Sequence, residues 1–174
     1  MTSPRVPNPD SRFPRVGIGY DSHRFVHPGP LTLGGVSIPF DRHLQGHSDG
    51  DAIAHAVTDA ILGAAGAGDI GEMFADTDPA NAGRDSIEML RAAVARIRAA
   101  GWRVQQVDAA VVAERPRIAN HRDAMRERLA DALGVDRSAV SIKGKTNEGM
   151  GWIGREEGLA CVAVATVVPV EAAG

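Results

Sequence analysis

The sequence predicts an α+β fold, in which a mixed β-sheet carries helices on one face and a small β-hairpin lies beside it. Three observations predict this fold: strand-like segments near both ends, three stretches with helical apolar spacing between them, and no internal repeat. The 174 residues suit one domain, and a hydrophobic content of 44% is enough to build one core.

The first elements are a tail, a strand and a hairpin. Residues 1–14 contain four of the ten prolines and no apolar period, so we expect a disordered tail there and a single domain over residues 15–174. Residues 16–23 have the composition of a strand. Residues 31–38 predict two short strands joined at Gly34-Gly35, which is typical of a β-hairpin.

Three helices are expected next. Ser48, with Asp51 three residues later, resembles a capping box that begins the first helix, which Gly66 ends. The second helix is expected over residues 85–101 and the third over residues 121–134, each with apolar residues at helical spacing.

Three further strands complete the expected sheet, at residues 104–112, 140–143 and 159–168. The last of them is an almost uninterrupted run of small and β-branched residues. Such a run is typical of a strand that is covered on both faces.

Charge and composition exclude several classes of partner. With 19 basic and 22 acidic residues the formal net charge is -3, so no overall field attracts nucleic acid or an anionic membrane. The single cysteine cannot form an intramolecular disulfide, and no stretch suits export or membrane spanning. We therefore expect a cytoplasmic protein without nucleic-acid or membrane partners, in which any phosphate site is local.

Asp21, His23 and His55 form a candidate metal site. Asp21 and His23 are two residues apart on a strand, so their side chains point to one face, about 7 Å apart. His55 lies one turn from both Asp51 and Asp59, and one of these carboxylates can orient its imidazole. One carboxylate with two imidazoles leaves a fourth tetrahedral position open, as in catalytic zinc sites. Ordinary solvated or hydrogen-bonded side chains are the alternative.

Two loops are candidate binding segments. His47 and Ser48 precede the first helix, where free N–H groups and the helix dipole favour a phosphate, although Ser48 can equally serve as a cap. Residues 69–78 place four carboxylates in ten residues, which suits the hydroxyls of a polyol or simply a solvated loop.

A third segment, residues 143–151, combines three glycines with both lysines of the chain, Thr146 and Glu148. Lysine and backbone N–H groups can neutralise a diphosphate, and Glu148 can bind magnesium together with phosphate oxygens and water. A plain flexible loop is the alternative.

Together these motifs resemble the family of 2-C-methyl-D-erythritol 2,4-cyclodiphosphate synthases of the non-mevalonate isoprenoid pathway. The resemblance implies the Bacillus chorismate mutase-like α+β fold, assembled as a homotrimer with active sites between subunits. The matching segments follow one another over residues 15–168: Gly17-x-Gly19-x-Asp21-x-His23, Gly34-Gly35-Val36-x-Ile38-Pro39, His47-Ser48-Asp49-Gly50-Asp51 with His55, Asp69-Ile70-Gly71, Asp76-Thr77-Asp78, Thr146-x-Glu148 and Gly154-Arg155-x-Glu157-Gly158.

The resemblance implies a reaction and its metals. The substrate is 4-diphosphocytidyl-2-C-methyl-D-erythritol 2-phosphate, whose own 2-phosphate attacks the β-phosphate and expels CMP, so the enzyme is a phosphorus–oxygen lyase without a protein nucleophile. His47 and Thr146 match positions that stabilise the transition state. The implied ligands are Asp21, His23 and His55 for Zn²⁺, and Glu148 for Mg²⁺ or Mn²⁺.

The resemblance also implies substrate contacts. Lys145 and Asn147 replace threonines that are common in relatives, and Lys145 lies in the diphosphate loop. Trp152 and Arg155 match positions that line a central trimer channel, for which an isoprenoid diphosphate is the candidate ligand. The full set of implied substrate-binding residues is Asp21, His23, His47, Ser48, Asp69, Ile70, Gly71, Phe74, Asp76, Asp78, Ala113, Pro116, Arg117, Ala119, Lys145, Thr146, Asn147, Glu148, Trp152 and Arg155.

Two other functions fit the same residues. A zinc-dependent phosphohydrolase would use the Asp, His, His set with zinc-bound water as nucleophile, and would give linear products. A trimeric nucleotide-binding module would use the histidines structurally, and would bind cytidine nucleotides without zinc or turnover.

Overall fold

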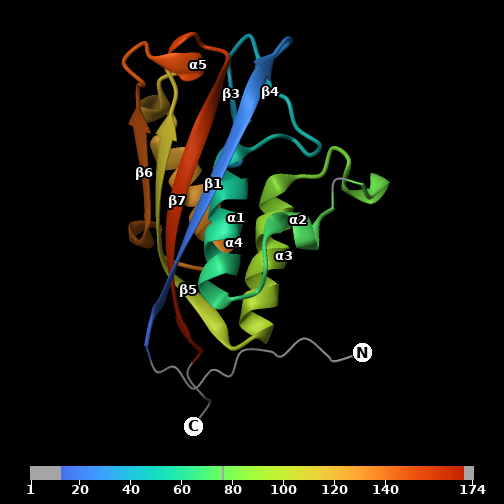
Figure 1. Cartoon of the computed structure of the whole chain (residues 1–174). Helices are drawn as coiled ribbons and strands as arrows, with labels where there is room; N and C mark the ends of the chain where they lie inside the picture. The colour runs from blue at the N-terminus through green and yellow to red at the C-terminus, as the bar shows by residue number, and fades with distance from the viewer. Residues whose placement is uncertain (1–12, 76, 171–174) are drawn as a thin grey trace.

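The structure, a computed structural model, describes residues 13–75 and 77–170. Most of the tail expected at residues 1–14 and the Asp76 position lie outside the described residues. Within them, a five-stranded sheet carries the long helices on one face, and a separate two-stranded hairpin lies beside it (Figure 1). This confirms the predicted α+β architecture with a mixed sheet.

The sheet has the strand order β4-β1-β7-β5-β6. Only the β5–β6 pair is parallel, and the other three pairs are antiparallel, so the sheet is mixed as predicted. The strands are β1 (Arg15–Val26), β4 (His43–Leu44), β5 (Trp102–Val112), β6 (Val140–Lys145) and β7 (Gly158–Pro169).

The hairpin and the three long helices confirm the sequence prediction, with bounds shifted by a few residues. The hairpin turn is Gly34-Gly35, whose φ angles of 58° and 71° are readily adopted by glycine. Two short helices and three 3₁₀ turns lie in segments expected to be irregular. The elements are β2 (Leu31–Leu33), β3 (Val36–Ile38), α1 (Ala52–Ala65), α2 (Ile70–Met73), α3 (Ser86–Ala99), α4 (Arg122–Leu133), α5 (Gly151–Gly154), η1 (Pro79–Asn81), η2 (Ile118–Asn120) and η3 (Arg137–Ala139).

The start of α1 differs from the predicted capping box. Asp51, not Ser48, is the N-cap, and its buried carboxylate accepts the N–H groups of Ile53 and Ala54. The same carboxylate accepts the N–H groups of the Gly34-Gly35 turn at 2.8 and 2.6 Å. One side chain therefore joins the hairpin to the helix that carries His55.

Helix α1 lies directly on strand β1, which is possible because two glycines of β1 face it. A Cβ atom at Gly17 would lie 2.1 Å from the carbonyl oxygen of Ala60, and one at Gly19 would lie 1.9 Å from that of Ala56. Figure 1 shows the helix running along the strand. This close approach brings side chains of α1 within reach of the next residues of β1.

The prediction that the last strand is covered on both faces is wrong for the single chain. The face of β7 that packs on the helices is fully buried, but Val164 on the other face is 40% exposed. On the neighbouring strand β1, Val16, Ile18 and Tyr20 are 57–69% exposed. The small and β-branched residues of the outer face therefore form an open apolar surface. No helix in the described part of the chain is long and apolar enough to cross a membrane.

Candidate metal centre and substrate cavities

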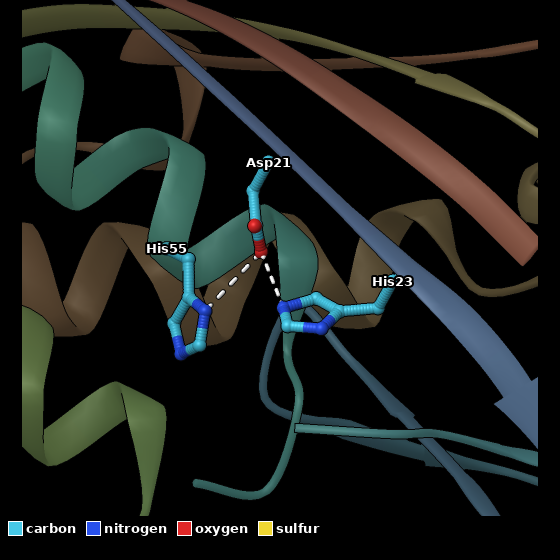
Figure 2. A group of neighbouring side chains, drawn as sticks. All are labelled: Asp21, His23 and His55. Atoms are coloured by element: carbon cyan, nitrogen blue, oxygen red, sulfur yellow. Dashed lines mark hydrogen bonds and ion pairs between the residues drawn. The ribbon is translucent and has the colours of Figure 1, made fainter. Parts of the chain in front are cut away.

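Asp21, His23 and His55 converge as the sequence predicts. One possible ligand atom from each side chain lies within 4.8 Å of the other two. Asp21 and His23 extend from one face of β1, and His55 extends from the first turns of α1 toward them (Figure 2). Alternation along the strand and the close contact of helix with strand thus bring one carboxylate and two imidazoles together.

Both imidazoles face the same carboxylate oxygen. His23 Nε2 lies 2.8 Å from Asp21 Oδ2, and His55 Nδ1 lies 3.2 Å from it. His23 Nδ1 donates to the carbonyl oxygen of Gln45 at 2.8 Å, so a neutral ring carries its lone pair on Nε2. This Nε2 is buried, and its contact with Asp21 Oδ2 lacks the geometry of a hydrogen bond. A buried lone pair beside a carboxylate oxygen fits a divalent cation.

The charges of the cluster are coupled. Burial by itself would raise the pKa of Asp21, but the contacts with His23 and His55 outweigh it and lower the pKa to about 2. Contact with Asp21 raises the pKa of His23, against the effect of burial. The carboxylate is therefore ionised at neutral pH, and a proton competes with a cation for His23.

His55 is not oriented by Asp51 or Asp59, contrary to the prediction. Asp51 accepts backbone N–H groups at the helix start and the hairpin turn, because an N-cap side chain points back over the first turn. Asp59 accepts the N–H of Ile70, the first residue of α2, at 2.8 Å. The contacts of His55 Nε2 are instead Ser86 Oγ at 2.9 Å and Ser48 Oγ at 3.0 Å.

The three candidate ligands line a cavity of about 210 Å³. Five other residues that the sequence assigned to substrate line it too: His47, Ser48, Ile70, Gly71 and Phe74. Asn81 and Met89 also line it, and no sequence motif had indicated them.

Asp69 and Asp78 do not line this cavity. Asp69 is the N-cap of α2 and accepts the N–H of Glu72, while Asp78 caps η1 and accepts the N–H of Ala80. Their carboxylates thus satisfy helix ends, a local role that a carboxylate-rich loop does not distinguish from hydroxyl binding.

A second cavity, of about 220 Å³, contains the residues assigned to the cytidine end and the diphosphate loop. Beside it, Thr146 Oγ1 donates to Glu148 Oε1 at 2.7 Å, and Glu114 accepts the N–H groups of Asn147 and Gly149. Its lining includes six residues of the segment 113–119, which the resemblance assigns to the cytidine end: Ala113, Glu114, Pro116, Arg117, Ile118 and Ala119. Gly144, Lys145 and Thr146 come from the predicted diphosphate loop, and Arg122 was not predicted.

The two cavities share no lining residue. Within the described residues of one chain, Glu148 lines neither of them, so it is not brought to the cavity of Asp21 and the histidines. Trp152 lines a separate cavity of about 230 Å³ that also reaches His23, and Arg155 donates to Glu157 at 2.7 Å.

Fold and site together define an α+β protein with a candidate metal centre of one carboxylate and two imidazoles. A model of the YgbB family matches residues 14–168. The chain belongs to the YgbB family. A protein of Gemmatimonas aurantiaca named 2-C-methyl-D-erythritol 2,4-cyclodiphosphate synthase is 66% identical over 156 residues, which are 90% of this chain and 94% of that protein.

Solved structures agree with this membership. IspF of Plasmodium falciparum in a CDP complex is 35% identical and superposes with a TM-score of 0.81, over 93% of this chain and 100% of that one. The bifunctional IspDF of Campylobacter jejuni is 38% identical with a TM-score of 0.88; the match covers 91% of this chain and 43% of that one.

Proposed function

We propose that the chain is a 2-C-methyl-D-erythritol 2,4-cyclodiphosphate synthase. It would convert 4-diphosphocytidyl-2-C-methyl-D-erythritol 2-phosphate into the cyclic diphosphate and CMP, in isoprenoid precursor biosynthesis. The observation that carries the proposal is the convergence of Asp21, His23 and His55 in a cavity, on a chain that is 66% identical to a relative of that name.

We propose Zn²⁺ at Asp21, His23 and His55, and Mg²⁺ or Mn²⁺ at Glu148. The donor set of one carboxylate and two imidazoles suits zinc, and the buried Nε2 of His23, 2.8 Å from Asp21 Oδ2, supports it. Glu148 provides one carboxylate, which suits a hard cation whose other ligands are phosphate oxygens and water. When bound, the two cations supply charge neutralisation for the diphosphate.

The chain's own side chains would position the phosphates. His47 is exposed at the cavity of the zinc ligands, and Thr146 lies at the second cavity. We assign both as donors to phosphoryl oxygens whose charge grows in the transition state. The attacking oxygen belongs to the substrate, so the rate depends on positioning and charge balance.

We assign the methylerythritol phosphate portion to the first cavity and the cytidine to the second. The CDP complex of the Plasmodium falciparum relative supports a site for a cytidine nucleotide in this family. The residues assigned to the first portion are Asp21, His23, His47, Ser48, Asp69, Ile70, Gly71, Phe74, Asp76 and Asp78; those assigned to the nucleotide and diphosphate are Ala113, Pro116, Arg117, Ala119, Lys145, Thr146, Asn147 and Glu148.

A homotrimer with the chorismate mutase-like fold would complete the site. Cavities of about 210 and 220 Å³ are smaller than ligand pockets of roughly 300–1,000 Å³. Half-sites contributed by two subunits account for this size and for the fact that Glu148 does not line the cavity of the zinc ligands in one chain. The exposed apolar side chains of Val16, Ile18 and Tyr20 support burial of the outer sheet face between subunits. Light scattering should give about three times 18.2 kDa.

Other assignments from the sequence stay proposals. Trp152 is 38% exposed, which suits contact with an isoprenoid diphosphate in a central channel that Arg155 would also line. A single catalytic domain over residues 15–174 is supported by the family match over residues 14–168. A cytoplasmic location without nucleic-acid or membrane partners rests on composition alone.

The proposal is tested by incubating the purified chain with the cytidine diphospho substrate and Mg²⁺ and following the phosphorus NMR spectrum, with and without a chelator. We expect the cyclic diphosphate and CMP in equal amounts, and no product after zinc removal. His55→Ala should lose zinc and most turnover. His27→Ala is the matched control, because His27 is an exposed histidine that donates only to the Asp41 carbonyl oxygen.

Two results would contradict the proposal. Linear phosphate products would favour a zinc phosphohydrolase instead. Nucleotide binding without turnover, in protein that contains no zinc by elemental measurement, would favour a binding module with structural histidines.

A further inference from the structure

Ser86 connects His55 to a carboxylate outside the candidate metal centre. Ser86 is the first residue of α3, and it is fully buried. Its Oγ lies 2.9 Å from His55 Nε2 and also contacts Asp49 Oδ1 in a short hydrogen bond. Asp49 and Ser86 have no role in the site as assigned above.

An ionised Asp49 sets the direction of the bonds that pass through Ser86, whereas the Ser48 hydroxyl, 3.0 Å from His55 Nε2, can act as donor or acceptor. An ionised carboxylate has no proton to donate, so the Ser86 hydroxyl donates to Asp49. A hydroxyl has a single proton, so Ser86 Oγ must accept from Nε2–H of His55. A neutral imidazole then carries its lone pair on Nδ1, the atom that lies 3.2 Å from Asp21 Oδ2.

Asp49 is held firmly enough to set this direction. Its Oδ2 accepts the backbone N–H of Ser86 at 3.2 Å, and its Oδ1 accepts that of Asp51 at 3.2 Å. Its own N–H donates to the carbonyl oxygen of Arg84, also at 3.2 Å. The carboxylate is therefore fixed between the start of α1 and the start of α3.

We propose that Asp49 and Ser86 form a relay that fixes His55 as its Nε2–H tautomer and directs Nδ1 at the metal position. Both are positioning residues, because neither contributes one of the three converging ligand atoms. The carbonyl oxygen of Gln45 has the same effect on His23 from the opposite ring nitrogen. The inference rests on the zinc site of the proposed function but on no feature of its substrate.

Zinc affinity of the folded protein tests the relay without any turnover. Loss of a group that orients a metal-bound histidine typically lowers metal affinity by about 10–100-fold. We expect Ser86→Ala to lower zinc affinity by this amount, and Ser86→Thr, which keeps a hydroxyl, to lower it less. Asp49→Asn should also lower zinc affinity. Thr58→Val is the control: Thr58 is a fully buried hydroxyl on α1, bonded to the Ala54 carbonyl oxygen, and its removal should leave affinity within twofold.

The tautomer is measured directly by ¹⁵N NMR of the zinc-free protein at alkaline pH, where Asp21 Oδ2, 3.2 Å from Nδ1, is the acceptor that competes with Ser86 for the ring proton. We expect Nε2–H in the wild type and a mixture of tautomers in Ser86→Ala, where the Ser48 hydroxyl is the remaining acceptor. Nδ1–H in the wild type would overturn the relay, as would unchanged zinc affinity in a folded Ser86→Ala variant. If the Ser86→Ala variant does not fold, the tautomer of His55 in the wild type alone tests the relay. Failure of cyclisation with a confirmed Nε2–H tautomer would refute the proposed function alone.

Discussion

Replacing Gly19 by alanine tests whether the contact of β1 with α1 sets the metal centre. The new Cβ atom would lie 1.9 Å from the carbonyl oxygen of Ala56, whereas ordinary contacts begin at 3.4 Å. The helix must therefore retreat by about 1.5 Å, since the obstacle is backbone and has no other rotamer. Because His55 precedes Ala56 and Asp21 follows Gly19 by two residues, the retreat separates Nδ1 of His55 from Asp21 Oδ2.

The free energy of unfolding, turnover and zinc affinity should fall together in Gly19→Ala. Overpacking of this kind lowers the free energy of unfolding by about 1–3 kcal/mol, which urea unfolding measures. A misplacement of about 1 Å lowers turnover by roughly 100-fold, and we expect zinc affinity to fall with it. Gly63→Ala is the matched control on α1. Apart from the backbone of α1 itself, no described atom lies within 4 Å of the new Cβ there, so we expect stabilisation by about 0.5–1 kcal/mol and unchanged zinc binding.

The reasoning would be refuted by a Gly19→Ala variant with the stability and zinc affinity of the wild type. In that case the separation of helix and strand would not be set by the glycines. Loss of stability with unchanged zinc affinity would show that the cluster forms independently of the contact.

Three further predictions concern single residues. Asp51→Ala should lower the free energy of unfolding, measured by urea unfolding, by at least about 3 kcal/mol, because four N–H groups lose their acceptor. A loss below about 1 kcal/mol would contradict the link between hairpin and helix. Burial raises the pKa of the Cys161 thiol above its ordinary 9.0, so above that pH only the unfolded chain releases this proton. The wild type should therefore lose about 1.4 kcal/mol of stability per pH unit more than Cys161→Ala, and equal slopes would count against a buried thiol. Glu148→Gln should weaken the magnesium dependence of turnover but leave zinc content unchanged; loss of zinc would contradict separate cation sites.

The sequence predicts the strand half of the metal centre from local geometry, whereas the convergence of His55 with Asp21, 34 positions away, depends on the contact of α1 with β1. Asp21 and His23 share a face through the two-residue period of a strand, and His55 stands at helical spacing from the Asp51 cap. The three long helices also follow from their apolar spacing and glycine ends, so their prediction required no tertiary information.

What sequence could not predict depends on contacts between distant segments. Ser86 reaches His55 from 31 positions away, and Glu114 organises a loop 33 positions further along the chain. The predicted role of Asp51 and Asp59 beside His55 was wrong because both carboxylates accept backbone N–H groups, Asp51 from the hairpin turn and the start of α1, and Asp59 from the start of α2. The predicted burial of the outer face of β7 was wrong for the single chain. A run of apolar residues indicates a buried strand but does not indicate whether the residues that bury it belong to the same chain or to another.

The most direct test of the account is anomalous X-ray scattering at the zinc absorption edge, from crystals grown with zinc. We predict one anomalous peak per chain at about 2.0–2.2 Å from Asp21 Oδ2, His23 Nε2 and His55 Nδ1. A fully zinc-loaded crystal with its peak elsewhere, or with these three side chains turned apart, would contradict it.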